Sequence, residues 1–254
     1  MKRIIVLFLA LIIAAGVCAC GAPKATDPGS TEAQMDKAAI REAFNKATAY
    51  IESNIDMSKM TKSTQDDDNG NDLYNYWSSD GGNKATFSNE ILIAGNAVEI
   101  GKTTVKDTES FDLKVNKSKN TVKPNEFVSV ELTKNGKTCI LTTGDNLTGK
   151  EANIDDLPIG SVSAAFDEYA LPFEYGGLTD KSTLKDVISL IGEPNNTVNL
   201  SVSQTGSVID VCYTKTTKDA GMTIDDNLTV FLYYDAASDS AMVKSVQLSR
   251  SIIE

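Results

Sequence analysis

One pair of side chains in this sequence has the spacing of a catalytic pair. Ser182 is followed three residues later by Lys185, a separation at which a lysine amine can help to activate a serine hydroxyl for nucleophilic attack. The Lys-Thr-Gly segment that such sites also need does not follow, and Thr103 repeats the same spacing with Lys106. The start of a capped helix explains both pairs, so we predict a structural role for Ser182 and Lys185.

Neighbouring carboxylates could support a different hydrolytic chemistry. Asp155 and Asp156 are adjacent, as are Asp167 and Glu168, and two carboxylates at a suitable separation can cleave a glycosidic bond. That separation is a property of the folded chain, and adjacent acidic residues are more often solvated. We therefore predict that the protein is not an enzyme. The alternative is a hydrolase that uses these carboxylates or the serine and lysine above.

The composition argues against several other functions. The sequence has no histidine, so it lacks histidine-dependent catalytic triads, histidine metal sites and the usual proton shuttle near neutral pH. We predict neither a metal nor a cofactor. The formal net charge is −11 and repels nucleic acid, so no nucleic-acid partner is expected. Cys139 and Cys212 lie in apolar segments and are either buried free thiols or one disulfide.

The first twenty residues predict where the protein resides. Two basic residues precede an uncharged apolar stretch, residues 4–17, which is short for a membrane-spanning helix and typical of a signal peptide. Val17 and Ala19 before Cys20 resemble the bacterial lipobox; an ordinary secretory signal and an uncleaved anchor are the alternatives. The resemblance implies that Cys20 carries a diacylglyceryl group. It thus implies a bacterial lipoprotein anchored in the cell membrane and facing outside the cytoplasm.

The region after this leader is predicted to begin with a linker and a helix. Residues 1–20 are the signal peptide and 21–30 a flexible linker. From residue 31 apolar residues recur at spacings of three and four, which predicts an amphipathic helix. A polar loop that contains Trp77 completes this part, residues 31–89. The apolar stripe of the helix consists of Ile40, Phe44, Ala47, Ile51 and Ile55.

Beyond residue 89 the pattern changes to strands. Apolar residues alternate with polar or small ones, as in strands with one buried face. The pair Asn135-Gly136 lies between two such segments, and both of its residues tolerate a positive φ. This part of the sequence therefore predicts antiparallel sheet with a hairpin at residues 135–136.

A helix start occurs twice in this part of the chain. Thr104 precedes Asp107, and Thr183 precedes Asp186; the threonine can cap the helix while the carboxylate favours the positive end of its dipole. Each start is followed by alternating segments. We therefore predict an α+β fold, in which an N-terminal helix precedes two small modules, each a short capped helix with an antiparallel β-sheet. The modules cover residues 90–170 and 171–254.

The second helix start also carries a family resemblance. Its segment ends in Gly192-Glu193-Pro194, where glycine ends the helix and proline prevents its continuation. Residues 178–250 resemble small outer-membrane-assembly lipoproteins and other modules related to the β-lactamase inhibitory protein fold. The resemblance implies an antiparallel sheet whose aromatic face binds other proteins, so we predict a lipid-anchored envelope protein that binds a protein or peptide. The candidate binding residues are Tyr74, Tyr76, Trp77, Tyr213 and Tyr233.

Overall fold

Alternating apolar residues build the longest strands of the molecule. In the computed structural model, Val211 lies opposite Val230, which lies opposite Val246, and all three are buried. Because successive residues of a strand point to opposite faces, one side of these strands is apolar. The three strands are β13 (Gly206–Asp219), β14 (Met222–Asp235) and β15 (Ser240–Ile253).

The structure describes most of the chain beyond its first 36 residues. The described residues belong to one compact unit. Within them, a few side chains at the ends of helices and strands are not described. The described ranges are 37–66, 72–78, 86–144, 146–147, 149–203, 206–219 and 221–253.

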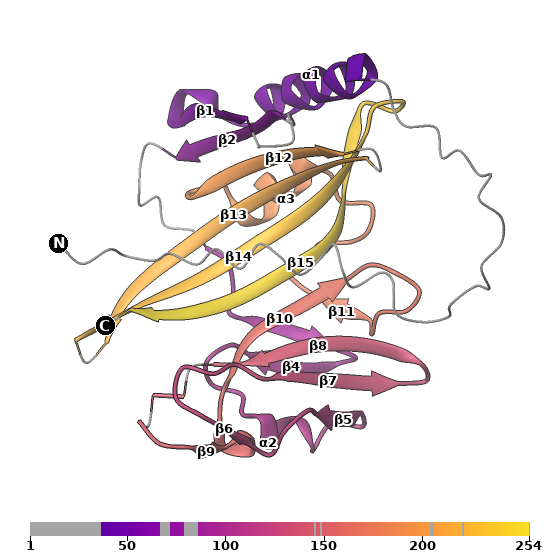
Figure 1. Ribbon diagram of the computed structural model, residues 1–254. Coiled ribbons are helices and arrows are strands. Elements are labelled where there is room, and N and C mark those ends of the chain that lie inside the picture. Colours follow the sequence, from indigo (N-terminus) through magenta and orange to yellow (C-terminus); the bar gives the residue numbers. More distant parts are fainter. Residues whose placement is uncertain are drawn as a thin grey trace. The chain divides into compact units, whose positions relative to one another are not determined.

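The long strands lie in the middle of one ten-stranded sheet (Figure 1). Its strand order is β1-β2-β12-β13-β14-β15-β10-β8-β7-β5, and all neighbours are antiparallel. The other seven strands are β1 (Met60–Asp66), β2 (Asp72–Ser78), β5 (Lys114–Lys117), β7 (Ser129–Lys134), β8 (Lys137–Thr143), β10 (Ile159–Ala165) and β12 (Thr197–Ser203).

The predicted α+β fold, with an N-terminal helix and two helix-capped modules, is wrong. The described chain is mostly β-sheet with three α-helices, and strands from both predicted modules share one sheet because β10 pairs with β15. Val162 lies opposite Leu248 at this junction, and both are buried. The alternation of apolar residues identifies which side chains of a strand point inward, but it does not identify the strand with which it pairs. The sequence pattern therefore could not show that the strands of both predicted modules form one sheet. In addition, β1 and β2 occupy part of the predicted polar loop.

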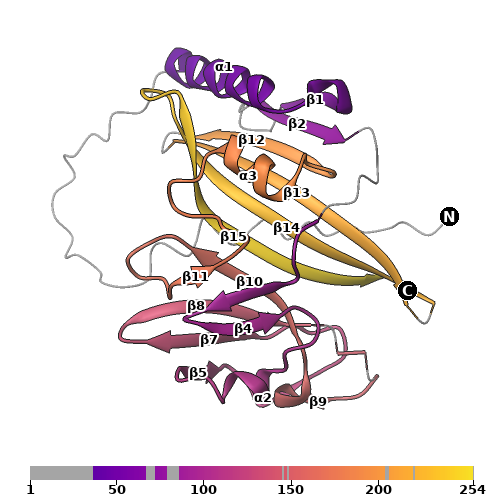
Figure 2. The same ribbon diagram turned by 180° about the vertical axis from the view of Figure 1, so that it is seen from behind.

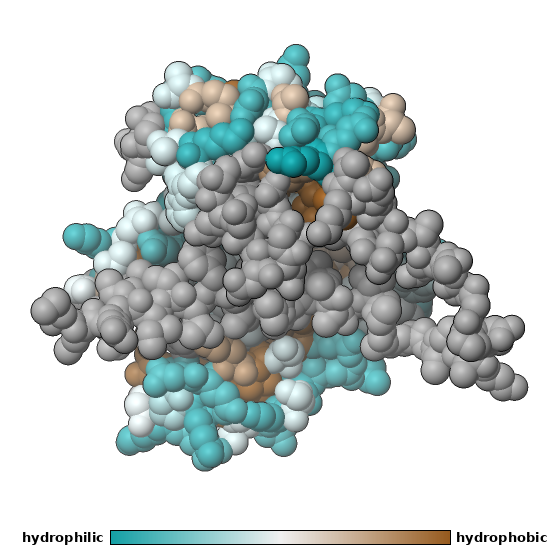
Figure 3. Space-filling model, turned by 45° about the horizontal axis from the view of Figure 1, so that its top comes forward, coloured by the Kyte–Doolittle hydropathy of each residue, from teal (hydrophilic) through white to brown (hydrophobic). Residues whose placement is uncertain are grey.

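The N-terminal helix is α1 (Lys37–Asn54). Its predicted apolar stripe is confirmed, because Phe44, Ala47, Ile51 and Ile55 are buried and Ile40 packs against the core. The predicted start at residue 31 lies outside the described residues. α1 contacts β12 and β13. Figure 3 shows that much of the coloured surface in that view is hydrophilic. None of the helices in the described ranges combines the length and apolar character needed to cross a membrane.

Both predicted helix caps are confirmed. Thr104 and Thr183 each form a capping box with the aspartate three residues on, and the Thr183 amide donates to Asp186 Oδ2 at 2.8 Å. Gly192 ends the second helix with a φ of 111°, where glycine avoids the strain of a side chain. The two helices are α2 (Val105–Thr108) and α3 (Leu184–Ile191).

The helix α3 lies on one side of the large sheet, as comparison of Figures 1 and 2 shows. The Tyr213 hydroxyl of β13 donates to the Gly192 carbonyl at 2.9 Å. The rings of Tyr50 on α1 and Tyr234 on β14 are 5.3 Å apart, and the Phe87 ring is 6.5 Å from that of Tyr213. We call this covered side the inner face and the opposite side the outer face.

Smaller elements complete the described structure. A three-stranded sheet has the order β11-β3-β4, and β6 pairs with β9. These elements are β3 (Glu90–Ile93), β4 (Asn96–Glu99), β6 (Thr121–Val122), β9 (Ala152–Asn153), β11 (Phe173–Glu174) and the 3₁₀ helices η1 (Met57–Lys59) and η2 (Ile154–Asp156).

A buried ion pair joins the segment around β3 and β4 to the inner face. Arg250 donates to both carboxylate oxygens of Asp226, at 2.6 and 3.1 Å, and Asn89 donates to Asp226 at 2.6 Å. Gly101 has a φ of +79°, and a Cβ there would lie 2.0 Å from an Arg250 nitrogen. The close approach therefore depends on the absence of a side chain at position 101.

Two local features set the strand register. The hairpin between β7 and β8 turns at Asn135-Gly136, both with positive φ, which confirms the prediction. In the β14–β15 pair, Phe231 lies opposite Ser245 whereas Leu232 lies opposite Val243. Lys244 is thus an extra residue in β15, and a bulge of this kind changes which residues reach each face.

The two cysteines of the described chain are free thiols. Cys139 lies on β8 and Cys212 on β13, and three strands separate β8 from β13 in the sheet. The sequence leaves open free thiols or one disulfide, and in the structure Cys139 and Cys212 form no disulfide with each other. Burial raises the pKa of Cys139 to about 12, so its thiol stays protonated and unreactive.

Candidate binding face

The outer face of the large sheet is polar but carries few charges. In an antiparallel pair, directly opposite residues share a face, so the strand register identifies its members. They are mainly hydroxyl and amide side chains. On the four central strands they include Thr197, Asn199, Ser201, Val208, Asp210, Cys212, Thr214, Asn227, Thr229, Phe231, Tyr233, Met242, Ser245, Gln247 and Ser249.

Apolar side chains gather at one end of this face. Tyr233 lies opposite Val208 on one side and Met242 on the other, and Phe231 is the next outer-face residue along β14. Tyr233 is 39% exposed and Met242 41%. The Tyr233 hydroxyl lies over Gly206, where an added Cβ would come within 2.0 Å of it. We call Val208, Phe231, Tyr233 and Met242 the aromatic cluster.

Trp77 is a second exposed aromatic residue on the outer face. It lies on β2 opposite Thr197 of β12 and is 45% exposed. Its strand is separated from β14 by β12 and β13. Trp77 and Tyr233, both predicted from the sequence as binding residues, therefore lie on the same face but at separate places.

A carboxylate lies between these two places. Asp210 of β13 is opposite Asn199 on β12 and Phe231 on β14. Within the described chain its Oδ1 atom has no hydrogen-bond partner and almost no contact with solvent. Burial raises the pKa of Asp210 to about 6, because the charged form loses hydration without gaining a partner.

The neighbouring Cys212 has no feature of a reactive thiol. Its sulfur accepts hydrogen bonds from Thr229 Oγ1 at 3.7 Å and, weakly, from Asn199 Nδ2 at 4.0 Å. Burial raises its pKa, and the charge of Asp210 adds to the effect. The thiol therefore stays protonated near neutral pH.

Two of the five predicted binding residues are not on an exposed face. Tyr76 and Tyr213 are fully buried; the Tyr76 hydroxyl donates to Glu52 at 3.1 Å, and Tyr213 bonds to the end of α3. For these two the prediction of an exposed binding role is corrected, since alternation places them on the inner face. The side chain of Tyr74 and the whole of Cys20 lie outside the described residues.

Ser182 and Lys185, the serine and lysine of the alternative hydrolase prediction, make structural contacts or are exposed to solvent. The Ser182 hydroxyl accepts from the Thr179 amide at 3.0 Å and is buried. The Ser182 carbonyl accepts from Val243 of β15. Lys185 is exposed on α3. These contacts support a role for Ser182 in the turn that precedes the helix.

The carboxylates of that alternative also make local contacts. Asp155 pairs with Lys117 at 2.6 Å. Asp167 accepts from the Tyr169 and Ala170 amides at 2.7 and 2.8 Å, which closes a turn. Across the described ranges, His, Cys, Asp and Glu residues form no group of three or more that could hold a metal.

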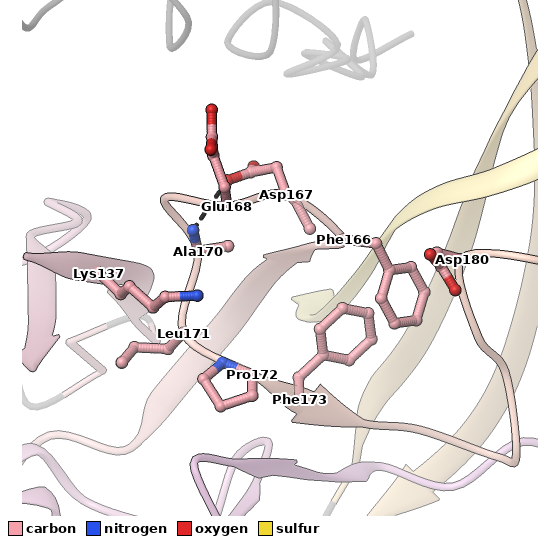
Figure 4. A pocket seen from close by; sticks show the side chains of 10 residues that line it. Lys137, Phe166, Asp167, Glu168, Ala170, Leu171, Pro172, Phe173 and Asp180 are labelled. Carbon is pink, nitrogen blue, oxygen red and sulfur yellow. Dashed lines mark hydrogen bonds between the residues drawn. The ribbon is translucent and has the colours of Figure 1, made fainter.

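An open cavity of about 490 Å³ lies beside that turn (Figure 4). The Phe166 and Phe173 rings are 4.3 Å apart and form one wall, with Lys137 and Asp180 on different sides of it. A smaller cavity of about 320 Å³ lies near the β5 edge. It is lined by Asn116, Lys117, Ser118, Ser129, Glu131 and Ile140.

The outer-face positions of Phe231, Met242 and Asp210 were not predicted from the sequence. The parity of residues along β13 and β14 carries this signal: residues that alternate with buried Val211 and Val230 must point outward. Met242 could not be found in this way, because the extra residue Lys244 reverses the parity of β15 before it.

Comparisons with protein-family models, curated proteins and solved structures give no match to this chain, so the functional argument depends on the geometry and chemistry of the outer face.

Proposed function

We propose that this protein is a lipid-anchored, non-catalytic component of the bacterial cell envelope that binds a protein or peptide through the outer face. The observation that carries the proposal is the aromatic cluster. It places Tyr233 and Met242 at exposed positions of a broad sheet whose opposite face is covered by α1, α3 and the small sheet.

The composition of the outer face supports a protein partner. Protein interfaces are enriched in aromatic residues, Met and Arg and depleted of Lys, Glu and Asp at their centres. Strands β13 and β14 present Val208, Phe231 and Tyr233 beside uncharged polar residues, and Asp210 adds a charge between them. A rigid sheet also binds with little loss of conformational freedom.

The proposed location depends on Cys20. The lipobox resemblance supports a diacylglyceryl anchor at the new amino terminus, and two acyl chains hold a protein stably at a membrane. Residues 21–30 would then separate the folded part from the lipid surface.

Photo-crosslinking tests the binding face in cells that make the protein. A photo-reactive amino acid is placed at position 233 or 242, and at position 190 as a control. Leu190 is 51% exposed but lies on α3, which packs on the inner face. We expect discrete crosslinked proteins from positions 233 and 242 and none of the same size from position 190. Equal crosslinks from all three positions, or none from the outer face, would refute the proposed function.

A further inference from the structure

We infer that the partner places a basic side chain against Asp210 and an apolar side chain against the aromatic cluster. This inference depends on the proposed function and adds the chemistry of the partner to it. It starts from the position of Asp210 on β13, one of the three long strands, on a face made mainly of uncharged residues.

The carboxylate of Asp210 has no counter-charge in the described structure. The ion pairs of the described residues involve other acidic groups. The two adjacent donors, Asn199 and Thr229, are directed to the Cys212 sulfur instead. A half-buried carboxylate without a partner is costly, and a cation from a binding partner removes that cost.

Phe231, which lies opposite Asp210 on β14, also suits a basic side chain. Phe231 offers an aromatic surface on which the stem of a lysine or the plane of an arginine can pack. A carboxylate beside an aromatic ring thus matches both parts of a basic side chain. By contrast, Asp225 further along β14 already accepts from Thr216 Oγ1 at 2.6 Å.

The strand geometry sets the spacing of the two contacts. Val208, which is opposite Tyr233, is two residues from Asp210, so the apolar and charged contacts are about 7 Å apart along the strand. This spacing suits an extended segment with a basic residue two positions from an apolar one. The net charge of −11 also attracts basic partners.

Selection from a library of random peptides tests this chemistry on the full chain. For the wild type we expect enriched sequences with Lys or Arg two positions from an apolar residue. Asp210→Asn should lose the basic preference and keep the apolar one, whereas the control Asp225→Asn should keep both. A basic preference that persists in Asp210→Asn overturns the inference.

The outcomes separate this inference from the proposed function. Enrichment of apolar residues without a basic one refutes the role of Asp210 and leaves the binding face standing. No enrichment by the wild type refutes both. Enrichment that survives Tyr233→Ala and Met242→Ala refutes the aromatic cluster as the apolar contact.

The pH dependence of a selected arginine peptide gives a second readout. Asp210 faces Asn199 on β12, Phe231 on β14 and the protonated thiol of Cys212, so it is the group that titrates near pH 6 at this place. One pH unit below its pKa, affinity should be roughly tenfold weaker. Asp210→Asn should show weak binding without this dependence, and an unchanged pH profile in that variant would contradict the inference.

Discussion

At the scale of single residues, the least expected feature is a carboxylate that folding leaves without a partner. Several acidic groups of the described chain have lowered pKa values through hydrogen bonds or ion pairs, for example Asp186 in its helix cap. Asp210 behaves in the opposite way, since burial raises its pKa to about 6. Such a group destabilises the folded state wherever the unfolded chain is ionised.

Asp210→Asn should therefore stabilise the protein near neutral pH. As pH rises from the ordinary pKa of 3.8 to about 6, the unfolded chain releases a proton that the folded chain retains, so wild-type stability falls. The gain from the substitution should reach about 3 kcal/mol at pH 7 and vanish below about pH 4. Urea denaturation at both pH values measures it. An equal difference at the two pH values would contradict the role of burial.

Two glycines with similar backbone angles allow a matched test of the buried ion pair. Gly101 and Gly95 have φ values of +79° and +81°, but a Cβ meets Arg250 only at Gly101 and meets nothing at Gly95. Gly95→Ala should cost about 1 kcal/mol of unfolding free energy through backbone strain. Gly101→Ala should cost about 2–3 kcal/mol, because Arg250 must also leave Asp226. Equal losses of unfolding free energy in the two variants, measured by thermal or urea denaturation, would show that displacing Arg250 from Asp226 has no cost.

At the scale of elements, short helices depend on their caps. α3 has only eight residues, so most of its stability comes from its ends and from its packing. Thr183→Ala should lower the unfolding free energy by about 1 kcal/mol. Thr183→Ser retains the hydroxyl and serves as the control in the same denaturation measurement. A loss as large in the serine variant would assign the effect to the methyl group instead of the cap.

Much of the secondary structure could be predicted from the sequence, but the pairing of strands could not. Local signals identified the caps at Thr104 and Thr183, the turn at Asn135-Gly136 and the stripe of α1, because each depends on residues a few positions apart. The β10–β15 junction joins residues far apart in the sequence. No local pattern encodes it, and so the single sheet was missed.

The candidate site was predicted only in part, because which face a strand residue occupies also depends on strand pairing. Trp77 and Tyr233 are on the outer face as aromatic residues of strands, but aromatic character alone did not separate them from buried Tyr76 and Tyr213. Facing direction separates them, and it follows from strand parity once the register is known.

At the scale of the whole molecule, the proposed attachment to the membrane depends on Cys20. Cys20→Ala should abolish labelling by radioactive fatty acid and release the protein from the membrane fraction. Wild-type protein in the same cells is the control, and Cys212→Ala should label normally. Labelling that persists in Cys20→Ala would exclude this residue as the attachment point.

The extra residue in β15 has a consequence for how such a face arises. Before and after Lys244, the side chains of β15 alternate between the two faces, but the alternation is shifted by one residue at Lys244. If Lys244 were instead paired regularly with Leu232, Met242 would face the core and Val243 would face the surface. The bulge thus decides whether this end of the sheet displays a thioether beside Tyr233 or conceals it, whereas deletion of Lys244 would leave both side chains on their present faces.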